Sequence, residues 1–429
     1  MARPLVRYLL GHSNIRIAVA DQIQNRAEEL IGDHASGTAI NMDVRDTAAL
    51  NQMIAATDIV ISLLPWTMHP RIAAFCLEHK KHLVTASYVT DEMLAFHEPA
   101  KEKGLLFVNE MGVDPGIDHM AAMKTINKIK GAGGKIISFY SYCGGLPAVA
   151  YNNNPLGYKF SWSPEGVLLA AENDGRYLKD GSVVEIPESK LFEHYWLKDI
   201  PRIGTFEAYV NRDALPYLDL YGIAKAKNIF RGTLRNIGHC ETWNLFKKLG
   251  LLNRKVKFDT QNMSPHQVIA NIIHSTKKEI KKDVADYLKI PEYSLALKKL
   301  EWLGMFRNES LDLGTVSVFE LFAHILKHKI TYKNGELDML LQHHEFVTSY
   351  PEGKEEMTMA TLIDKGTQGG DSSMSKTVGL PVAIAARLIA EDSINLKGVC
   401  IPVYSQIYEP VLKELENLNI KLSEKKITL

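Results

Sequence analysis

Short apolar segments alternate with amphipathic segments over roughly the first quarter of the chain, and this alternation limits the possible folds more than any other feature. The apolar segments, which predict strands, are Ile15–Ala20, Thr38–Met42, Asp58–Leu64, His82–Ala86 and Leu105–Asn109. The amphipathic segments, which predict helices, are Ala2–Leu10, Gln22–Ile31, Asp46–Ala55, His69–His79 and Asp91–Lys103. Repeated β-α units of this size predict an α/β fold with a doubly wound, Rossmann-like parallel sheet.

The opening of this pattern differs from a complete dinucleotide-binding fold. Such a fold normally begins with a strand and a glycine-rich turn that brings backbone amides to the pyrophosphate. Here the predicted helix comes first, so Ile15–Ala20 takes the place of the second strand. We therefore expect the sheet to lack its first strand. We expect Met1 to be either an internal methionine, with that strand and its turn encoded in frame upstream, or the result of a real truncation.

The later part of the chain has a different pattern. The strand-like run Lys135–Tyr142 is followed by long segments that mix polar and aromatic residues, and Glu241–Ile330 is largely helical by periodicity. The longest expected helices there are Ser264–Ile290 and Thr315–His328. The expected elements after them are the strands Asp338–Tyr350 and Lys354–Ile363, the turn Pro351–Gly353, a helix starting in Pro381–Ala390, the strand Gly398–Pro402 and the helix Glu409–Leu418.

Composition excludes several classes of protein. Lys plus Arg and Asp plus Glu both total 50, so bulk charge gives no support for a nucleic-acid or membrane partner. Four widely separated cysteines form no C-x-x-C pair, which argues against a zinc ribbon or a disulfide scaffold and fits a reducing cytoplasm. They are Cys76, Cys143, Cys240 and Cys400. We expect no metal site, because His324 and His328 lack a third ligand and His343 and His344 alternate along a strand.

Asp21 ends the first predicted strand, where an acidic residue can accept hydrogen bonds from the adenosine ribose hydroxyls. Its carboxylate would repel a 2′-phosphate, and no arginine follows directly, so the sequence favours NAD over NADP. The alternative interpretation is a helix N-cap, and the two roles are compatible.

Several motifs resemble one family. The stretch Asn109–Met120, N-E-M-G-V-D-P-G-I-D-H-M, is similar to the signature E-x-G-x-D-P-G-x-D-H-M of glutamate-forming saccharopine dehydrogenases. Further segments with the same resemblance are Ile61–Pro65, Val84–Tyr88, Ser141–Pro147, Asn154–Pro164, Asn211–Asp213, Phe230–Arg235 and Lys376–Pro381. The motifs are long, ordered and spread over nearly the whole chain, so the resemblance is specific. It fails only at the front, where the opening strand and glycine turn are absent.

The resemblance implies three parts and a reaction. A Rossmann-like dinucleotide-binding domain would comprise residues 1–125 and 375–429. A mixed α+β domain for substrate binding and dimerisation would comprise 126–240 and 331–374, with a helical insertion at 241–330. The implied cytoplasmic homodimer uses NAD or NADP to oxidise saccharopine to L-glutamate and 2-aminoadipate 6-semialdehyde, or catalyses the reverse reaction, in lysine metabolism.

Saccharopine carries three carboxylates, and arginine pairs with carboxylates in a fixed fork geometry. Arg212 and Arg235 lie in matching motifs and are our candidates for this role. The resemblance adds the following substrate contacts: Ser87, Asp114, Cys143, Gly144, Thr233 and Leu234. It also implies the following cofactor contacts beside Asp21: Leu63, Leu64, Pro65, Thr85, Ala86, Ser87 and Val113.

The acid or base of the reaction is less well defined. Asp114 lies in a loop where it could hold the substrate ammonium or move a proton during imine hydrolysis. His119 could also serve as the acid or base, but a hydrogen-bonded helix residue is an equally good interpretation. Two other functions stay open, namely a carboxynorspermidine-type C–N oxidoreductase, which would need an acidic pocket in place of the arginines, and a non-catalytic relic that has lost its cofactor site.

Overall fold

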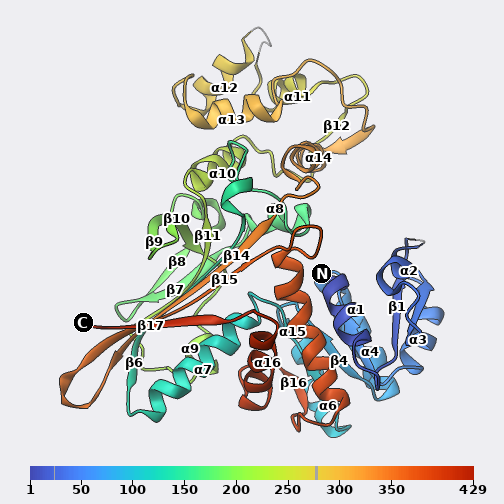
Figure 1. Cartoon of the computed structure of the whole chain (residues 1–429). Helices are drawn as coiled ribbons and strands as arrows, with labels where there is room; N and C mark the ends of the chain where they lie inside the picture. Colours follow the sequence, from blue (N-terminus) through green and yellow to red (C-terminus); the bar gives the residue numbers. More distant parts are fainter. Residues whose placement is uncertain (24, 276–278) are drawn as a thin grey trace. The chain divides into compact units, whose positions relative to one another are not determined.

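The computed structural model describes residues 1–23, 25–275 and 279–429 (Figure 1). The chain divides into two compact units. Unit 1 comprises Met1–Ile137, Asp219–Lys225 and His344–Leu429, and unit 2 comprises Ser138–Leu218 and Ala226–His343. The three-part division expected from the sequence stays a prediction.

Unit 1 contains two parallel sheets. Strands β1 (Ile17–Asp21) and β2 (Gly37–Asn41) form one pair. The second sheet has the order β16-β5-β4-β3, and its strands are β3 (Ile59–Ser62), β4 (His82–Thr85), β5 (Leu106–Val108) and β16 (Gly398–Cys400). Among the described strands, no strand lies between β1 and β3 to join the two sheets. Apolar side chains such as Leu83 and Phe107 are fully buried, as expected for parallel strands covered on both faces.

The helices of the first β-α units follow the predicted order, with one correction. They are α1 (Ala2–Leu10), α2 (Arg26–Ile31), α3 (Thr47–Ala55), α4 (His69–His79), α5 (Asp91–Leu94), α6 (His97–Glu102) and α7 (Ile117–Gly131). The single helix expected over Asp91–Lys103 is wrong, because the structure has α5 and α6 there. Pro99 lacks a backbone N–H and fits the first turn of a new helix better than the middle of a long one.

The end of the chain completes unit 1 with α15 (Ser373–Ala390), α16 (Ser405–Asn417), β15 (Glu355–Lys365) and β17 (Leu422–Thr428). Figure 1 shows α15 beside α1, and the two helices are in contact. The expected helix start near Pro381 is wrong, because α15 begins at Ser373 and holds Pro381 inside it. Ser372 caps the earlier start by accepting a hydrogen bond from the backbone N–H of Ser375.

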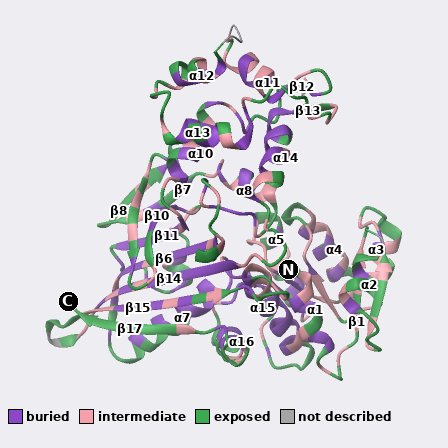
Figure 2. Cartoon of the chain, turned by 45° about the horizontal axis from the view of Figure 1, so that its top comes forward, coloured by how far each residue is buried: buried purple, intermediate pink, exposed green. Residues whose placement is uncertain are grey.

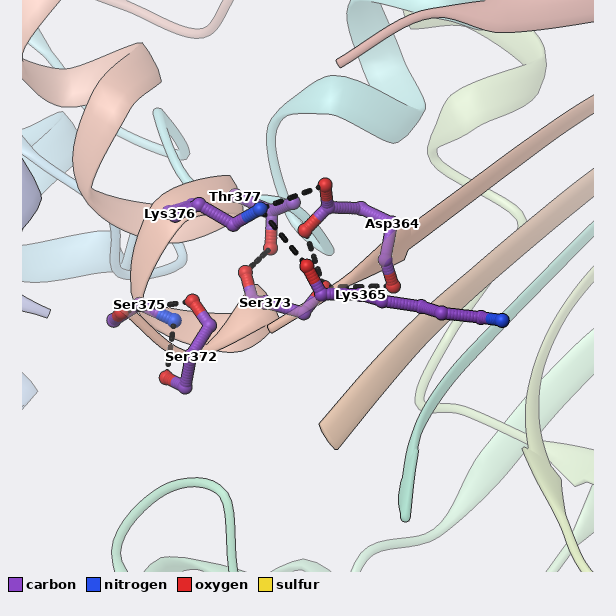
Figure 3. Close-up of polar contacts among 7 residues, drawn as sticks. All are labelled: Asp364, Lys365, Ser372, Ser373, Ser375, Lys376 and Thr377. Atoms are coloured by element: carbon purple, nitrogen blue, oxygen red, sulfur yellow. Dashed lines mark hydrogen bonds and ion pairs between the residues drawn. The ribbon is translucent and has the colours of Figure 1, made fainter. Parts of the chain in front are cut away.

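A polar cluster fastens the start of α15 to the end of β15 (Figure 3). The Lys376 ammonium donates to Asp364 Oδ1 and to the Lys365 carbonyl, both at 2.9 Å. The Ser373 hydroxyl lies 2.6 Å from Asp364 Oδ2. Because Asp364 is largely buried, these bonds satisfy a carboxylate that would otherwise be costly to remove from water.

Unit 2 is built on a mixed sheet with the order β14-β6-β11-β10-β9, in which β6 and β11 are parallel. Its strands are β6 (Lys135–Pro147), β7 (Gly175–Lys179), β8 (Ser182–Ile186), β9 (Tyr195–Ile200), β10 (Gly204–Val210), β11 (Asn228–Arg235) and β14 (Asp338–Ser349). The ends of β6 and β14 belong to unit 1, where β14 pairs with β15. Figure 2 shows β6, β11 and β14 as mostly buried. The sequence analysis missed β7 to β11.

Helices predominate between β11 and β14. They are α10 (His239–Lys248), α11 (Pro265–Ile272), α12 (Ile280–Leu288), α13 (Leu295–Leu303) and α14 (Val318–Ile330). The same region contains a short antiparallel pair of strands, β12 (Lys257–Asp259) and β13 (Thr315–Ser317). Two shorter helices, α8 (Pro164–Ala170) and α9 (Tyr217–Leu220), come earlier in the chain.

Of the two long helices expected in this region, Ser264–Ile290 is wrong, and Thr315–His328 is confirmed except at its start. Ser264–Ile290 contains α11 and α12, and residues 276–278 of it lie outside the described residues. Thr315–Ser317 is a strand, and α14 starts after it because Ser317 and Glu320 form a capping box. Of the helices in the described ranges, none is both long enough and apolar enough to cross a membrane.

Candidate active site

The predicted cofactor residues of unit 1 lie at or just beyond the carboxyl ends of parallel strands. Asp21 is the last residue of β1, and Leu63–Pro65 follow β3 directly. Thr85 ends β4, Ala86 and Ser87 follow it, and Val113 lies in the turn after β5. Ligands bind at this edge of open α/β sheets. The structure therefore places these residues where a dinucleotide site is expected.

Asp21 lines a pocket of about 110 Å³ beside β1, α2 and β2. Its Oδ1 accepts a hydrogen bond from the backbone N–H of Ile23 at 2.8 Å, which stabilises the turn after β1. The helix cap position belongs to Asn25, so Asp21 is not the N-cap of α2. Glu28 is a second carboxylate in the lining, and no lysine or arginine is among the described residues that line the pocket.

A buried histidine that the sequence analysis missed connects the ends of β3 and β4. His69 Nδ1 lies 3.0 Å from Ser62 Oγ, and Nε2 lies 2.8 Å from Ser87 Oγ and 3.0 Å from Thr85 Oγ1. Burial lowers the pKa of His69 from 6.5 to about 4, so the imidazole is neutral near pH 7. The only sequence signal for this contact is a histidine just after a strand and its loop.

The turn that carries Asp114 is tightly constrained. The Tyr88 hydroxyl donates to Asp114 Oδ1 at 3.2 Å, so the loop after β4 and the turn after β5 meet. The Asp114–Pro115 peptide bond is cis. A Cβ at Gly116 would lie 2.0 Å from the Gly112 carbonyl oxygen, so only glycine fits there. The structure thus brings the predicted Ser87 loop and Asp114 together.

His119 lies inside a buried network of unit 1. Its Nε2 is 2.7 Å from Glu110 Oε2, and its Nδ1 is 2.5 Å from the Tyr221 hydroxyl. The Glu110 carboxylate also accepts the backbone N–H of Val89 at 3.0 Å. His119 is fully buried and both of its ring nitrogens are engaged, which favours the interpretation as a hydrogen-bonded helix residue. Its catalytic role stays a prediction.

Asn109 is a second residue that the sequence analysis did not single out. It follows β5 at the same sheet edge and is fully buried. Within the described residues, neither its Oδ1 nor its Nδ2 has a hydrogen-bond partner. Each unsatisfied buried polar group costs about 1–3 kcal/mol, so this amide is suited to a ligand with both a donor and an acceptor.

Four predicted substrate contacts of unit 2 lie side by side on β6 and β11. Cys143 is paired with Thr233 in the parallel ladder. A Cβ added to Gly144 would lie 2.7 Å from the Leu234 carbonyl oxygen, so the absence of a side chain lets the two strands approach closely. Burial leaves Cys143 as a packed residue, which agrees with a contact through its backbone.

Arg235 is buried in unit 2 without an ion-pair partner among the described residues. Its guanidinium stacks 4.9 Å from the centre of the Tyr158 ring, and Nη1 donates to the Leu234 carbonyl at 3.0 Å. Its Nε has no hydrogen-bond partner in the part of the chain that the structure describes. Glu207 is directly opposite in the β10–β11 ladder, but its carboxylate accepts the backbone N–H groups of Gly238 and Cys240. A buried cation in this state favours an anionic ligand.

Arg212 lies at the other end of the same strand pair. The ladder joins Val210 to Gly232, and the Asn211 N–H donates to the Arg231 carbonyl, so Arg212 is level with Phe230. At about 3.4 Å per residue, the backbones of Arg212 and Arg235 are roughly 17 Å apart. The two predicted arginines therefore start from different levels of this strand pair, and we expect them to contact different carboxylates.

Comparisons with known proteins agree with this geometry. Residues 1–108 match the family described as "Saccharopine dehydrogenase NADP binding domain", and residues 112–420 match "Saccharopine dehydrogenase C-terminal domain". The chain belongs to the saccharopine dehydrogenase family. The resemblance seen in the sequence is thus confirmed, and so is a domain for a nicotinamide dinucleotide.

Individual members of the family are similar over most of the chain. The saccharopine dehydrogenase [NADP(+), L-glutamate-forming] of Pyricularia oryzae is 36% identical and covers 97% of this chain and 95% of its own. The alpha-aminoadipic semialdehyde synthase of Arabidopsis thaliana is also 36% identical over 96% of this chain, which spans only 41% of that protein. The solved structure of the apo saccharopine dehydrogenase (L-Glu forming) of Saccharomyces cerevisiae has a TM-score of 0.89 at 34% identity. The match covers 99% of this chain and 97% of that chain. The predicted α/β fold class is confirmed.

Proposed function

We propose that this oxidoreductase converts saccharopine to L-glutamate and 2-aminoadipate 6-semialdehyde, or catalyses the reverse reaction. The names of the Pyricularia and Saccharomyces relatives support this reaction. In the chain itself, the observation that carries the proposal is Arg235, a buried guanidinium with no carboxylate partner among the described residues. A carboxynorspermidine-type enzyme would be expected to place acidic groups at this position, so the buried cation favours saccharopine.

The chemistry assigns simple roles to the chain's own residues. Bound nicotinamide supplies the acceptor for the hydride that leaves the carbon next to the substrate's secondary amine. Water then adds to the C=N bond of the oxidised substrate, and the C–N bond breaks to release glutamate and the aldehyde. Asp114, held by the Tyr88 hydroxyl, would bind the substrate ammonium or move a proton during this hydrolysis.

We propose NAD as the preferred cofactor. The NADP(+) in the names of the family domain and of the Pyricularia relative favours NADP. The lining of the Asp21 pocket favours NAD, because Asp21 and Glu28 place two carboxylates there and would repel a 2′-phosphate. The unsatisfied amide of Asn109 would pair with the carboxamide of the nicotinamide, which offers one donor and one acceptor.

Nicotinamide absorbance tests the reaction directly. The assay mixes the chain with saccharopine and NAD or NADP, with carboxynorspermidine as the comparison substrate. Turnover of saccharopine with a higher kcat/KM for NAD is the expected result. Turnover of carboxynorspermidine alone would replace the proposed substrate. If neither substrate reacts and a fluorescence titration shows no cofactor binding, the chain is a non-catalytic relic.

We also propose a cytoplasmic homodimer that associates through unit 2. The four cysteines are buried and form no disulfide among the described residues, which suits a reducing compartment. Strand β9 lies at the edge of the mixed sheet, and Tyr195 and Leu197 on one of its faces are exposed. Unpaired edge strands with apolar side chains are suited to pairing with a second copy. Light scattering should give twice the chain mass, and Leu197→Asp should reduce it to that of one chain. An unchanged mass for this variant would exclude β9 as the interface.

A further inference from the structure

His69 makes three side-chain hydrogen bonds at the carboxyl edge of the parallel sheet in unit 1. Its Nδ1 faces Ser62 at the end of β3, and its Nε2 faces Thr85 and Ser87 at and after the end of β4. His69, Ser62 and Thr85 are all buried, with exposed fractions of 1%, 4% and 1%. Ser87 is only half-buried. Of these four side chains, Ser87 alone can therefore also contact a bound molecule.

The backbone around Ser87 is fixed as well. The Ser87 N–H donates to Thr85 Oγ1 at 3.3 Å, and the Ser87 carbonyl accepts the Glu110 N–H at 3.0 Å. With the backbone held, the remaining freedom of this residue is the rotation of its side chain. A hydrogen bond to His69 Nε2 removes that freedom.

We propose that His69 is a positioning residue that holds the Ser87 hydroxyl in one orientation toward a polar group of saccharopine. This inference rests on the proposed function. Nε2 of the neutral imidazole carries one N–H or one lone pair, and its shorter contact is to Ser87 Oγ at 2.8 Å, against 3.0 Å to Thr85 Oγ1. It therefore engages one side of the Ser87 hydroxyl and leaves the other side for the ligand. The neutral form also avoids an uncompensated charge at this buried position.

Replacing His69 with each of two amide residues distinguishes the role of Nδ1 from that of Nε2. Asparagine places its amide near the position of Nδ1 and keeps a partner for Ser62, whereas glutamine reaches the position of Nε2 and keeps a partner for Ser87. His69→Asn should therefore raise the KM for saccharopine about tenfold, as should Ser87→Ala, because each loses one oriented hydrogen bond. His69→Gln should stay within about twofold of the wild type. In all three variants the KM for the cofactor should change less than the KM for saccharopine.

The double variant and a matched control complete the experiment. Adding His69→Asn to Ser87→Ala should cause no further increase in the KM for saccharopine, because the effects of two residues that act as one unit are not additive. His79→Asn, which changes a histidine of the same helix that bonds Asn51, should leave the kinetics unchanged. If His69→Asn unfolds the chain, Ser87→Ala and His69→Gln still carry the test.

The possible failures are distinguishable. A wild-type chain that does not oxidise saccharopine refutes the proposed function and this inference with it. An active wild type refutes the inference alone in either of two cases. In the first, Ser87→Ala leaves the KM unchanged. In the second, His69→Asn and His69→Gln lower the melting temperature equally and leave the KM unchanged, which is the result for a purely structural histidine.

Discussion

Replacing Arg235 with methionine should separate stability from activity. Methionine keeps an unbranched side chain of similar length and removes the buried charge. Desolvation of an ion without a partner costs several kcal/mol, and here the Tyr158 ring and the Leu234 carbonyl offset part of that cost. Those two contacts contribute about 2 and about 1.5–3 kcal/mol. The free energy of unfolding of Arg235→Met should therefore be unchanged or higher by up to about 2 kcal/mol.

The same substitution should damage catalysis. Loss of one partner of a buried, charge-assisted contact costs about 2–5 kcal/mol, so kcat/KM for saccharopine should fall at least about 30-fold. Steady-state kinetics and urea unfolding of the same samples measure both quantities. Arg254→Ala is the control, because Arg254 is an exposed arginine of unit 2 paired with Glu172 at 3.3 Å. A marked loss of stability with unchanged kinetics would show that Arg235 is structural.

The separation of the two arginines adds a quantitative check. Effects of sites more than 7–10 Å apart usually add to within about 0.5 kcal/mol. Because the Arg212 and Arg235 backbones are roughly 17 Å apart along the ladder, the double variant Arg212→Ala with Arg235→Met should show additive losses in kcat/KM. A coupling energy well above that limit would mean that both side chains grip one carboxylate.

Three further predictions concern unit 1. Asp21→Ser should shift the ratio of kcat/KM for NADP over NAD about tenfold toward NADP, and an unchanged ratio would leave Asp21 as a turn residue only. His69 has a pKa lowered by burial from 6.5 to about 4, so the unfolded chain binds the extra proton first as the pH falls. The contribution of neutral His69 to the free energy of unfolding is fully present above pH 6.5 and should decline by up to about 3 kcal/mol as the pH falls toward 4. His69→Gln should make the free energy of unfolding, measured in urea, depend less steeply on pH over this range. Asp364→Ala should lower the free energy of unfolding by about 1–3 kcal/mol, whereas Lys365→Ala, whose side chain points away from the cluster in Figure 3, should change it by less than about 0.5 kcal/mol.

The sequence was most informative where both faces of a strand are buried. Strands such as β3 and β4 are continuous apolar runs, and their helices keep a regular period, so the succession of strands and helices along the chain could be read directly. Strand β9 shows why unit 2 was harder. It places Tyr195 and Leu197 on its exposed face, so apolar residues do not mark its buried face and the alternation is hidden.

The site shows the same limit at the level of single residues. Motifs identified Ser87, Asp114 and Arg235, because each lies in a segment with a recognisable pattern. They could not identify His69, whose contacts with Ser62 and Ser87 depend on how α4 packs against two strands. The sequence motifs could not give the distance between Arg212 and Arg235 either. That distance depends on how β10 and β11 are aligned with each other, and neither motif specifies this alignment.

The buried polar atoms without partners give a second, independent indication of where ligands bind. Native structures leave few such atoms, so each described exception has to be explained. Arg235 carries a charge and Asn109 lacks a partner at both ends of its amide among the described residues, so each costs more than a single hydroxyl such as that of Thr358. Arg235 ends a motif predicted to contact the substrate, and Asn109 opens the motif that carries Asp114. Under the proposed function, these two groups are the ones that a tricarboxylate substrate and a carboxamide-bearing cofactor would satisfy.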